Sequence, residues 1–217
     1  MTTWLSVLTP DRRRPQAAAD LAEADRLHRR IMQLFPAGLG ERPRHGSGVL
    51  FRVDEEPSNV NVLLQSGIEP EPGRLPDGYA HVRVRTLDPL LDALRPGLPV
   101  RYRLVANATR KLGRNTKQGE PLTVVPLHGA DAEAWWARKA QEAGLEVRTL
   151  SMTPLAPALG KRAPGRAGGQ GPVPHARTCF DGTAQILDAD RLRAALLGGI
   201  GRAKSYGCGL LTIAPGR

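Results

Sequence analysis

Residues 198–215 read GGIGRAKSYGCGLLTIAP, and this glycine-rich stretch says most about how the chain is organised. Its glycines stand at 198, 199, 201, 207 and 209, with Arg202 and Lys204 between them. Glycine adopts positive φ angles and lets a ligand come close to the backbone, and Arg and Lys carry the charge that binds phosphate. The stretch is equally typical of a helix end followed by a turn and a last strand. From these residues alone, both interpretations stay open.

The segments before this stretch follow the order β-α-β-β-α-β. A strand is expected at 122–127, a helix ending at Gly144, strands at 145–152 and 175–187, and a helix ending at Leu197. The Pro- and Gly-rich segment 154–174 between the two middle strands is expected to be a mobile loop or a hairpin tip. The last strand lies at the end of the glycine-rich stretch.

The first half of the chain has the same order of elements. The pattern predicts a strand at 3–8, a helix at 17–35, a pair of strands at 49–54 and 59–66, a short helix opened by Asp88 and a strand at 100–107. The resulting prediction is an α+β fold of two tandem ferredoxin-like βαββαβ domains with a basic cleft between them. The domains are expected at 1–107 and 121–217, joined by a basic linker loop at 108–120. The duplication is one of pattern, because the residues themselves show no strong repeat.

The charge of the chain favours an anionic partner. Lys and Arg number 31 against 21 Asp and Glu, which gives a net charge of +10 and a pI near 10.5. Such an excess attracts nucleic acid. The two cysteines, Cys179 and Cys208, form no CxxC pair, which argues against a thiolate zinc site and favours a reducing, cytoplasmic location. No segment is long and apolar enough to span a membrane, so no membrane partner is expected.

The histidines and carboxylates show no metal-ligand spacing, and neither a GxSxG nor a Walker A motif is present. No metal and no cofactor are therefore expected. Metal-free acid–base chemistry remains, and His28 is the candidate for it. Arginines surround His28 in DRLHRRIMQLF, so its protonated form is disfavoured until a phosphate binds nearby. The alternative is a histidine of no consequence on a helix surface.

The motifs DRLHRRIMQLFP and GIGRAKSYGCGLLTIAP, with FRVD, NVLLQS, RYRLVANATRK and WWARKAQEAG between them in order, resemble the CasE family. The resemblance covers essentially the whole chain. CasE proteins are endoribonucleases of the type I-E Cascade complex that process CRISPR RNA. The family has two tandem ferredoxin-like (RRM-like) folds. It cuts the repeat stem-loop at the base of its 3′ side without metal, leaves a 2′,3′-cyclic phosphate and a 5′-hydroxyl, and stays bound as a Cascade subunit.

The resemblance also implies the site residues. The family's active histidine lies in a Y-x-x-H motif of the first helix, and His28 matches it, whereas Asp25 stands at the tyrosine position. From their charge, Arg29 and Lys111, or another base of the loop 108–120, are expected to support catalysis near the phosphate. Asp25 is a further candidate for support, and whether it orients His28 or faces solvent stays open. The residues expected to bind RNA are Arg110, Lys111, Arg114, Lys117, Lys161, Arg162, Arg166, Gly199, Gly201, Arg202, Lys204, Gly207 and Gly209.

The expected partners are the CRISPR repeat hairpin and the other Cascade subunits, with no small-molecule substrate. Two other classes of function compete with this prediction. One is a non-catalytic module for structured RNA, in which His28 is incidental. The other is a small-molecule phosphate binder that uses the glycine-rich stretch, which the spread of charge over many loops disfavours.

Overall fold

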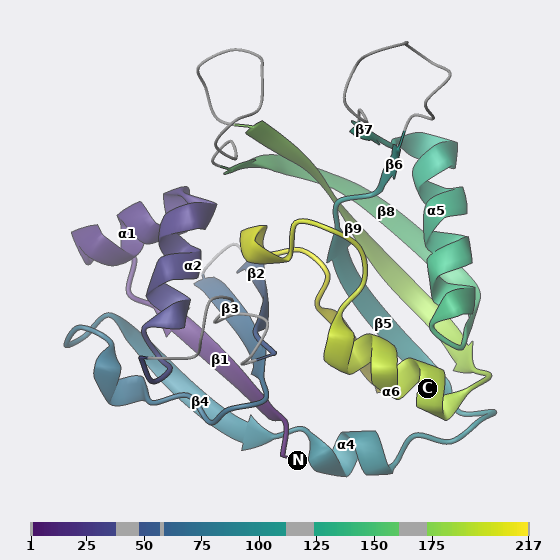
Figure 1. Cartoon of the computed structure of the whole chain (residues 1–217), viewed down its shortest axis with the longest axis horizontal. Coiled ribbons are helices and arrows are strands. Elements are labelled where there is room, and N and C mark those ends of the chain that lie inside the picture. The colour runs from purple at the N-terminus through teal and green to yellow at the C-terminus, as the bar shows by residue number, and fades with distance from the viewer. Residues whose placement is uncertain (1, 38–47, 57–58, 112–123, 161–172, 217) are drawn as a thin grey trace.

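The computed structural model describes residues 2–37, 48–56, 59–111, 124–160 and 173–216. They form two α+β modules, each with a four-stranded antiparallel sheet (Figure 1). A small two-stranded sheet, β6 (Thr109–Lys111) with β7 (Val124–Pro126), stands apart from both. Within the described residues no helix is long and apolar enough to cross a membrane.

The first module has the strand order β2-β3-β1-β4. Its elements are β1 (Trp4–Pro10), α1 (Pro15–Ala22), α2 (Ala24–Met32), β2 (Leu50–Glu56), β3 (Asn59–Ser66), the 3-10 turn η1 (Pro72–Arg74) and β4 (Ala80–Thr86). Counted within the module, this is the ferredoxin-like order 2-3-1-4. The buried side chains of α2, Leu27 and Ile31, pack with Phe51 and Leu64 of the sheet. Burial of this apolar face fixes α2 on the sheet.

The second module has the order β10-β5-β9-β8. Counted within the module this is 4-1-3-2, which is the order of the first sheet read from its other edge. Its elements are β5 (Pro99–Ala106), α5 (Gly129–Glu142), β8 (Leu145–Gly160), β9 (Val173–Ile186), α6 (Ala189–Gly198), η3 (Lys204–Tyr206) and β10 (Leu211–Pro215). A short helix, α4 (Asp88–Asp92), leads into it from β4. Trp135 and Trp136 of α5 are both buried against Phe180, so neither is available to stack on a base.

The tandem ferredoxin-like architecture is confirmed, but the expected domain boundary misplaces one strand. The strand expected at 100–107 is β5, and it pairs with β9 and β10 of the second sheet rather than with the first. The strand expected at 122–127 is the short β7, which pairs with β6. Sheet membership therefore divides the chain between β4 and β5. Between β3 and β4 the described part of the first module has η1 in place of a full second helix.

The helix expected at 17–35 is two helices. Glu23 between them has an extended backbone, with φ −127° and ψ 111°. The carboxylate of Asp20, at the end of α1, accepts hydrogen bonds from Arg26 and Arg30 of α2. Because this buried ion pair needs α2 to turn back toward α1, the break at Glu23 sets the direction of the helix that carries His28.

Polar contacts join the two modules. The guanidinium of Arg52, 3% exposed, forms two hydrogen bonds with Asp54 and donates from Nη1 to the carbonyls of Arg103 and Leu210 and to Oγ1 of Thr212. The amide of Gln65 in β3 donates to the carbonyl of Leu196 in α6. These bonds fix the first sheet against β5, β10 and α6.

Candidate active site

His28 lies on α2, on the side that meets the C-terminal glycine-rich stretch. Its ring stacks on Phe51 of β2, with centroids 6.2 Å apart and an interplanar angle of 21°. The side chain is half-buried and its Nε2 atom is buried. The turn η3 lies against both α2 and β2. The sheet on one side and η3 on the other therefore restrict the position of the imidazole.

The direction of α2 depends on the Asp20 cluster, which comprises Asp20, Arg26, Arg30 and Tyr79. Asp20 is 3% exposed, and its Oδ2 lies 2.8 Å from Nε of Arg30. The guanidinium of Arg30 also lies over the ring of Tyr79, 5.0 Å from its centroid. Burial, together with the neighbouring Asp20 carboxylate, raises the pKa of Tyr79, which keeps the phenol neutral. The cluster anchors both arginines that flank His28 on the helix.

The glycine-rich stretch lies between the two modules and contacts the first through η3. It leaves α6 at Gly199 and runs between the modules to η3 before returning as β10 (Figure 1). A Cβ atom at Gly199 would lie 2.8 Å from Leu50, and one at Gly207 would lie 3.3 Å from Phe51. Both glycines have positive φ, at 70° and 75°. Glycine is therefore required here by protein packing, whether or not RNA also approaches the backbone.

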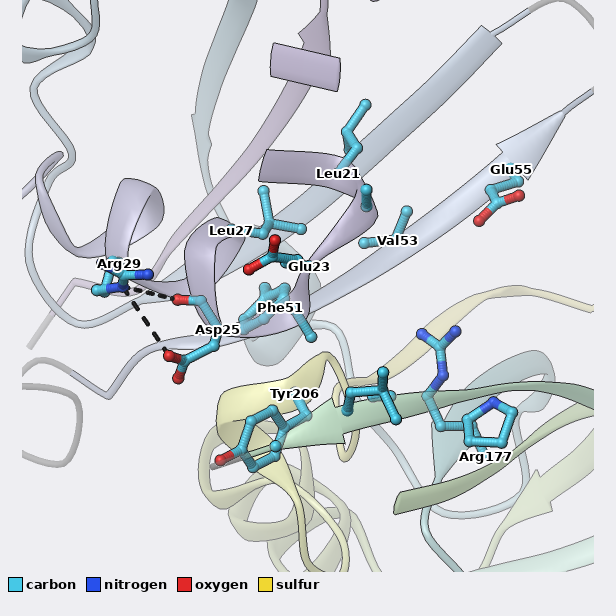
Figure 2. A pocket seen from close by; sticks show the side chains of 16 residues that line it. Leu21, Glu23, Asp25, Leu27, Arg29, Phe51, Val53, Glu55, Arg177 and Tyr206 are labelled. Carbon is cyan, nitrogen blue, oxygen red and sulfur yellow. Dashed lines mark hydrogen bonds and ion pairs between the residues drawn. The ribbon is translucent and has the colours of Figure 1, made fainter. Parts of the chain in front are cut away.

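A cavity of about 800 Å³ lies where the modules meet. The α1–α2 junction and β2 line it on one side, and the ends of β8 and β9 and Tyr206 line it on the other (Figure 2). Its charged lining residues are Glu23, Asp25, Arg29, Glu55 and Arg177. The described wall of this cleft is thus of mixed charge rather than uniformly basic. His28 does not line it, although its neighbours Leu27 and Arg29 do.

Two of the expected supporting residues lie beside His28 on α2. Arg29 is exposed, and its Nε lies 3.4 Å from the carbonyl oxygen of Asp25 and 4.0 Å from its carboxylate. Figure 2 shows both side chains at the same edge of the cavity. The third, Lys111, is an exposed residue of β6, and Figure 1 shows β6 near α5 and well apart from α2. The structure therefore brings Asp25 and Arg29, but not Lys111, to His28.

The residues expected to bind RNA differ in exposure. Arg110, Lys111, Gly201 and Arg202 are exposed, Gly199 and Lys204 are half-buried, and Gly207 and Gly209 are buried. Lys204 donates a hydrogen bond to the carbonyl of Gly198, which closes the loop on itself. Arg114, Lys117, Lys161, Arg162 and Arg166 lie outside the described residues.

The structure adds a pair of residues that the sequence did not single out. The rings of His175 on β9 and Tyr206 in η3 stack 4.5 Å apart at 21°. Tyr206 lines the cavity together with Asp25 and Arg29. The sequence offered one signal for this pair, an aromatic residue inside a glycine-rich stretch. It gave no signal for the partner, because His175 lies in the distant strand β9. Among the described side chains, no group of three or more His, Cys, Asp or Glu residues could hold a metal ion.

A family model described as CRISPR associated protein matches residues 3–215. The chain is 31% identical to the CRISPR system Cascade subunit CasE of Escherichia coli K12, over 87% of this chain and 90% of that one. It is 29% identical to the CRISPR-associated endoribonuclease Cse3 of Thermus thermophilus, over 98% and 100% of the two chains. The chain belongs to the CasE/Cse3 family.

Among solved structures, this CasE/Cse3 family member is similar to Thermus thermophilus Cse3 bound to an RNA that represents a pre-cleavage complex. The TM-score is 0.79 at 27% identity, covering 99% of this chain and 100% of the other. The likeness therefore extends over both modules.

Proposed function

We propose that this protein is an endoribonuclease that binds the CRISPR repeat stem-loop, cuts pre-crRNA at the base of its 3′ side and remains bound as a Cascade subunit in the cytoplasm. Membership of the CasE/Cse3 family supports the reaction class. One structural observation carries the assignment of the site. The histidine-bearing helix α2 lies against the glycine-rich stretch of the second module, beside a cavity edged by Arg29 and Arg177.

The proposed chemistry is a transesterification within the RNA. The ribose 2′-oxygen attacks the adjacent phosphorus, the bond from phosphorus to the 5′-oxygen breaks, and the products are a 2′,3′-cyclic phosphate and a 5′-hydroxyl. The 2′-hydroxyl loses a proton and the 5′-oxygen gains one, and His28 performs one of these transfers. The reaction needs positioning and nearby cations rather than a metal ion.

Arg29 is the cation best placed to stabilise the charge that develops on the phosphate. Arg29 follows His28 directly on α2, and its side chain is 65% exposed. The Nε2 atom of His28 is buried, so the use of this atom requires the ring to turn or η3 to move when RNA binds. Asp25, which interacts with Arg29, orients that guanidinium.

The exposed cations Arg110, Lys111 and Arg202 are proposed to contact the RNA backbone. An A-form stem offers side chains little in its narrow major groove, so recognition depends on shape and phosphate contacts. Lys204 and the glycines act mainly by shaping the loop, because Gly207 and Gly209 are buried. Binding is expected to weaken steeply as salt rises, because counterions are released when phosphates are neutralised.

The reaction class is tested with a repeat hairpin that carries a single 2′-deoxy nucleotide at the cut. Without the nucleophile, we expect no product, while the dissociation constant stays unchanged. The all-ribose hairpin should be cut equally well with and without EDTA and leave a cyclic phosphate. Cleavage of the 2′-deoxy hairpin would contradict the mechanism, and so would loss of all-ribose hairpin cleavage when EDTA is added.

A further inference from the structure

The ring of Tyr206 is held in place more firmly than loop packing requires. His175 covers one face, at 4.5 Å between centroids. Gly160, at the end of β8, supports its edge: a Cβ there would lie 2.6 Å from Cζ of Tyr206 and 2.7 Å from Nε2 of His175. Only glycine fits at this position without displacing both rings.

The backbone of η3 adds to this constraint. Ala203, which precedes η3, has a positive φ of 58°, and within the described part of the chain it is the only residue other than glycine that does. Gly207, which follows it, has φ 75°. A left-handed conformation is unfavourable for alanine and persists only where the surroundings enforce it. The two left-handed residues on either side of η3, together with the hydrogen bond from Tyr206 N to Ala203 O, fix the backbone of the tyrosine.

The chemistry of the pair suits a flat and uncharged ligand. Burial lowers the pKa of His175, so the imidazole stays neutral at neutral pH. Tyr206 lines the cavity and His175 does not, so His175 supports the tyrosine from behind. The cavity, at about 800 Å³, lies within the roughly 300–1,000 Å³ typical of ligand sites. A nucleobase stacks on an aromatic side chain in such a setting.

We propose that Tyr206, backed by His175, stacks an unpaired nucleobase that flanks the scissile phosphate. The inference rests on the proposed function and names a specificity element for the same site. Figure 2 shows Tyr206 across the cavity from Asp25 and Arg29, with Arg177 on its own side of the cavity. Arg29 and Arg177 are the two cationic residues that line the cavity, one on each wall, so the phosphate of a base stacked on the tyrosine has a cation on either wall. The stack thereby selects for an unpaired nucleotide next to the stem.

The test measures affinity for uncleavable 2′-deoxy hairpins, each with an abasic site at one nucleotide near the cut. Tyr206→Leu keeps apolar bulk against His175 but removes the aromatic face, and Tyr206→Phe keeps the face. We expect Tyr206→Leu to bind the intact hairpin about tenfold more weakly, in line with base–aromatic stacking. Tyr206→Phe should match the wild type. For the hairpin that lacks the stacked base, the wild type and Tyr206→Leu should bind with the same affinity.

A fluorescent base gives a second measurement. 2-Aminopurine placed at the position of the stacked base should be quenched on binding to the wild type and to Tyr206→Phe, but not to Tyr206→Leu. If Tyr206→Leu weakens binding equally for every abasic hairpin, or weakens it for none, the stacking inference is overturned while the proposed function stays intact. If the wild type binds no hairpin at all, the proposed function and this inference both fail.

Discussion

At the scale of single residues, two ion-pair clusters with a buried centre support the arrangement of the site. Asp20 joins the end of α1 to Arg26 and Arg30 of α2. Arg52 pairs with Asp54 of its own strand and donates hydrogen bonds to β5 and β10 of the second sheet. Removing one member of a buried pair leaves the other charge without compensation, which costs far more than losing an exposed pair. The Asp20 cluster therefore supports the helix that carries His28, and Arg52 supports the contact between the sheets.

The Asp20 cluster gives the first prediction. Asp20→Asn keeps the shape but removes the charge that Arg26 and Arg30 face. We expect the free energy of unfolding in urea to fall by about 2–3 kcal/mol, somewhat below the cost for a fully buried pair because Arg26 is partly exposed.

Glu71→Gln is the matched control for Asp20→Asn. It breaks the pair with Arg74, in which both side chains are about half exposed. The free energy of unfolding should fall far less than in Asp20→Asn, because an exposed ion pair contributes little to stability. An equal fall in the free energy of unfolding in Asp20→Asn and Glu71→Gln would show that the Asp20 cluster does not anchor α2.

At the scale of elements, the glycine-rich stretch between α6 and β10 links α2, the helix that carries His28, to the second module. Its turn η3 lies against α2, β2 and β8. A Cβ at Gly207 would lie 3.3 Å from the ring of Phe51, on which His28 stacks. The stretch thus supports the imidazole through one intermediate side chain.

Gly207→Ala tests this support. The new Cβ would meet Phe51 at 3.3 Å in a backbone with φ 75°. We expect a loss of about 1–2 kcal/mol in stability and a drop in single-turnover cleavage that exceeds the loss of hairpin affinity, because the displaced Phe51 moves His28. Gly97→Ala is the control: its φ of 86° carries the same backbone cost, but no atom lies within 4 Å of its Cβ. It should lower stability without lowering cleavage, and equal effects on cleavage would contradict the account.

Local patterns predicted most elements but not all of their pairings. The alternation in residues 100–107 predicts a strand correctly. The partners of β5, however, lie about 70–115 residues further along the chain, and alternation carries no information about such distant pairing. The break at Glu23 has no Gly or Pro to signal it and results from the tertiary pairing of Asp20 with α2. The stack of Tyr206 on His175 likewise depends on how η3 meets β9. The family motif that points to His28 is local and can be read from the sequence, and the catalytic role of His28 stays a prediction.

At the scale of the whole molecule, the two sheets are joined as one unit rather than held by a flexible connection. Arg52 alone donates to groups of Asp54, β5 and β10. The cavity needs both modules, since α2 and β2 supply one wall and β8, β9 and η3 the other. The site exists only while this arrangement holds.

Arg52→Met tests the coupling of the modules by calorimetry. The wild type should unfold in one cooperative transition. The variant leaves the Asp54 carboxylate unpaired and removes the bonds to β5 and β10, at a cost of about 3–4 kcal/mol. We therefore expect the variant to unfold at a lower temperature than the wild type, and in two transitions instead of one. A single transition at the wild-type temperature would contradict a coupling role for Arg52.

The most direct test of the account is cleavage by His28→Ala. With a radiolabelled repeat hairpin, single-turnover cleavage should fall by at least ~100-fold, the usual minimum for a lost acid–base group, while the dissociation constant changes less than about threefold. His81→Ala, which removes an exposed histidine of β4, should cleave normally. Wild-type cleavage by His28→Ala would contradict the central claim and leave the protein as a non-catalytic RNA-binding module.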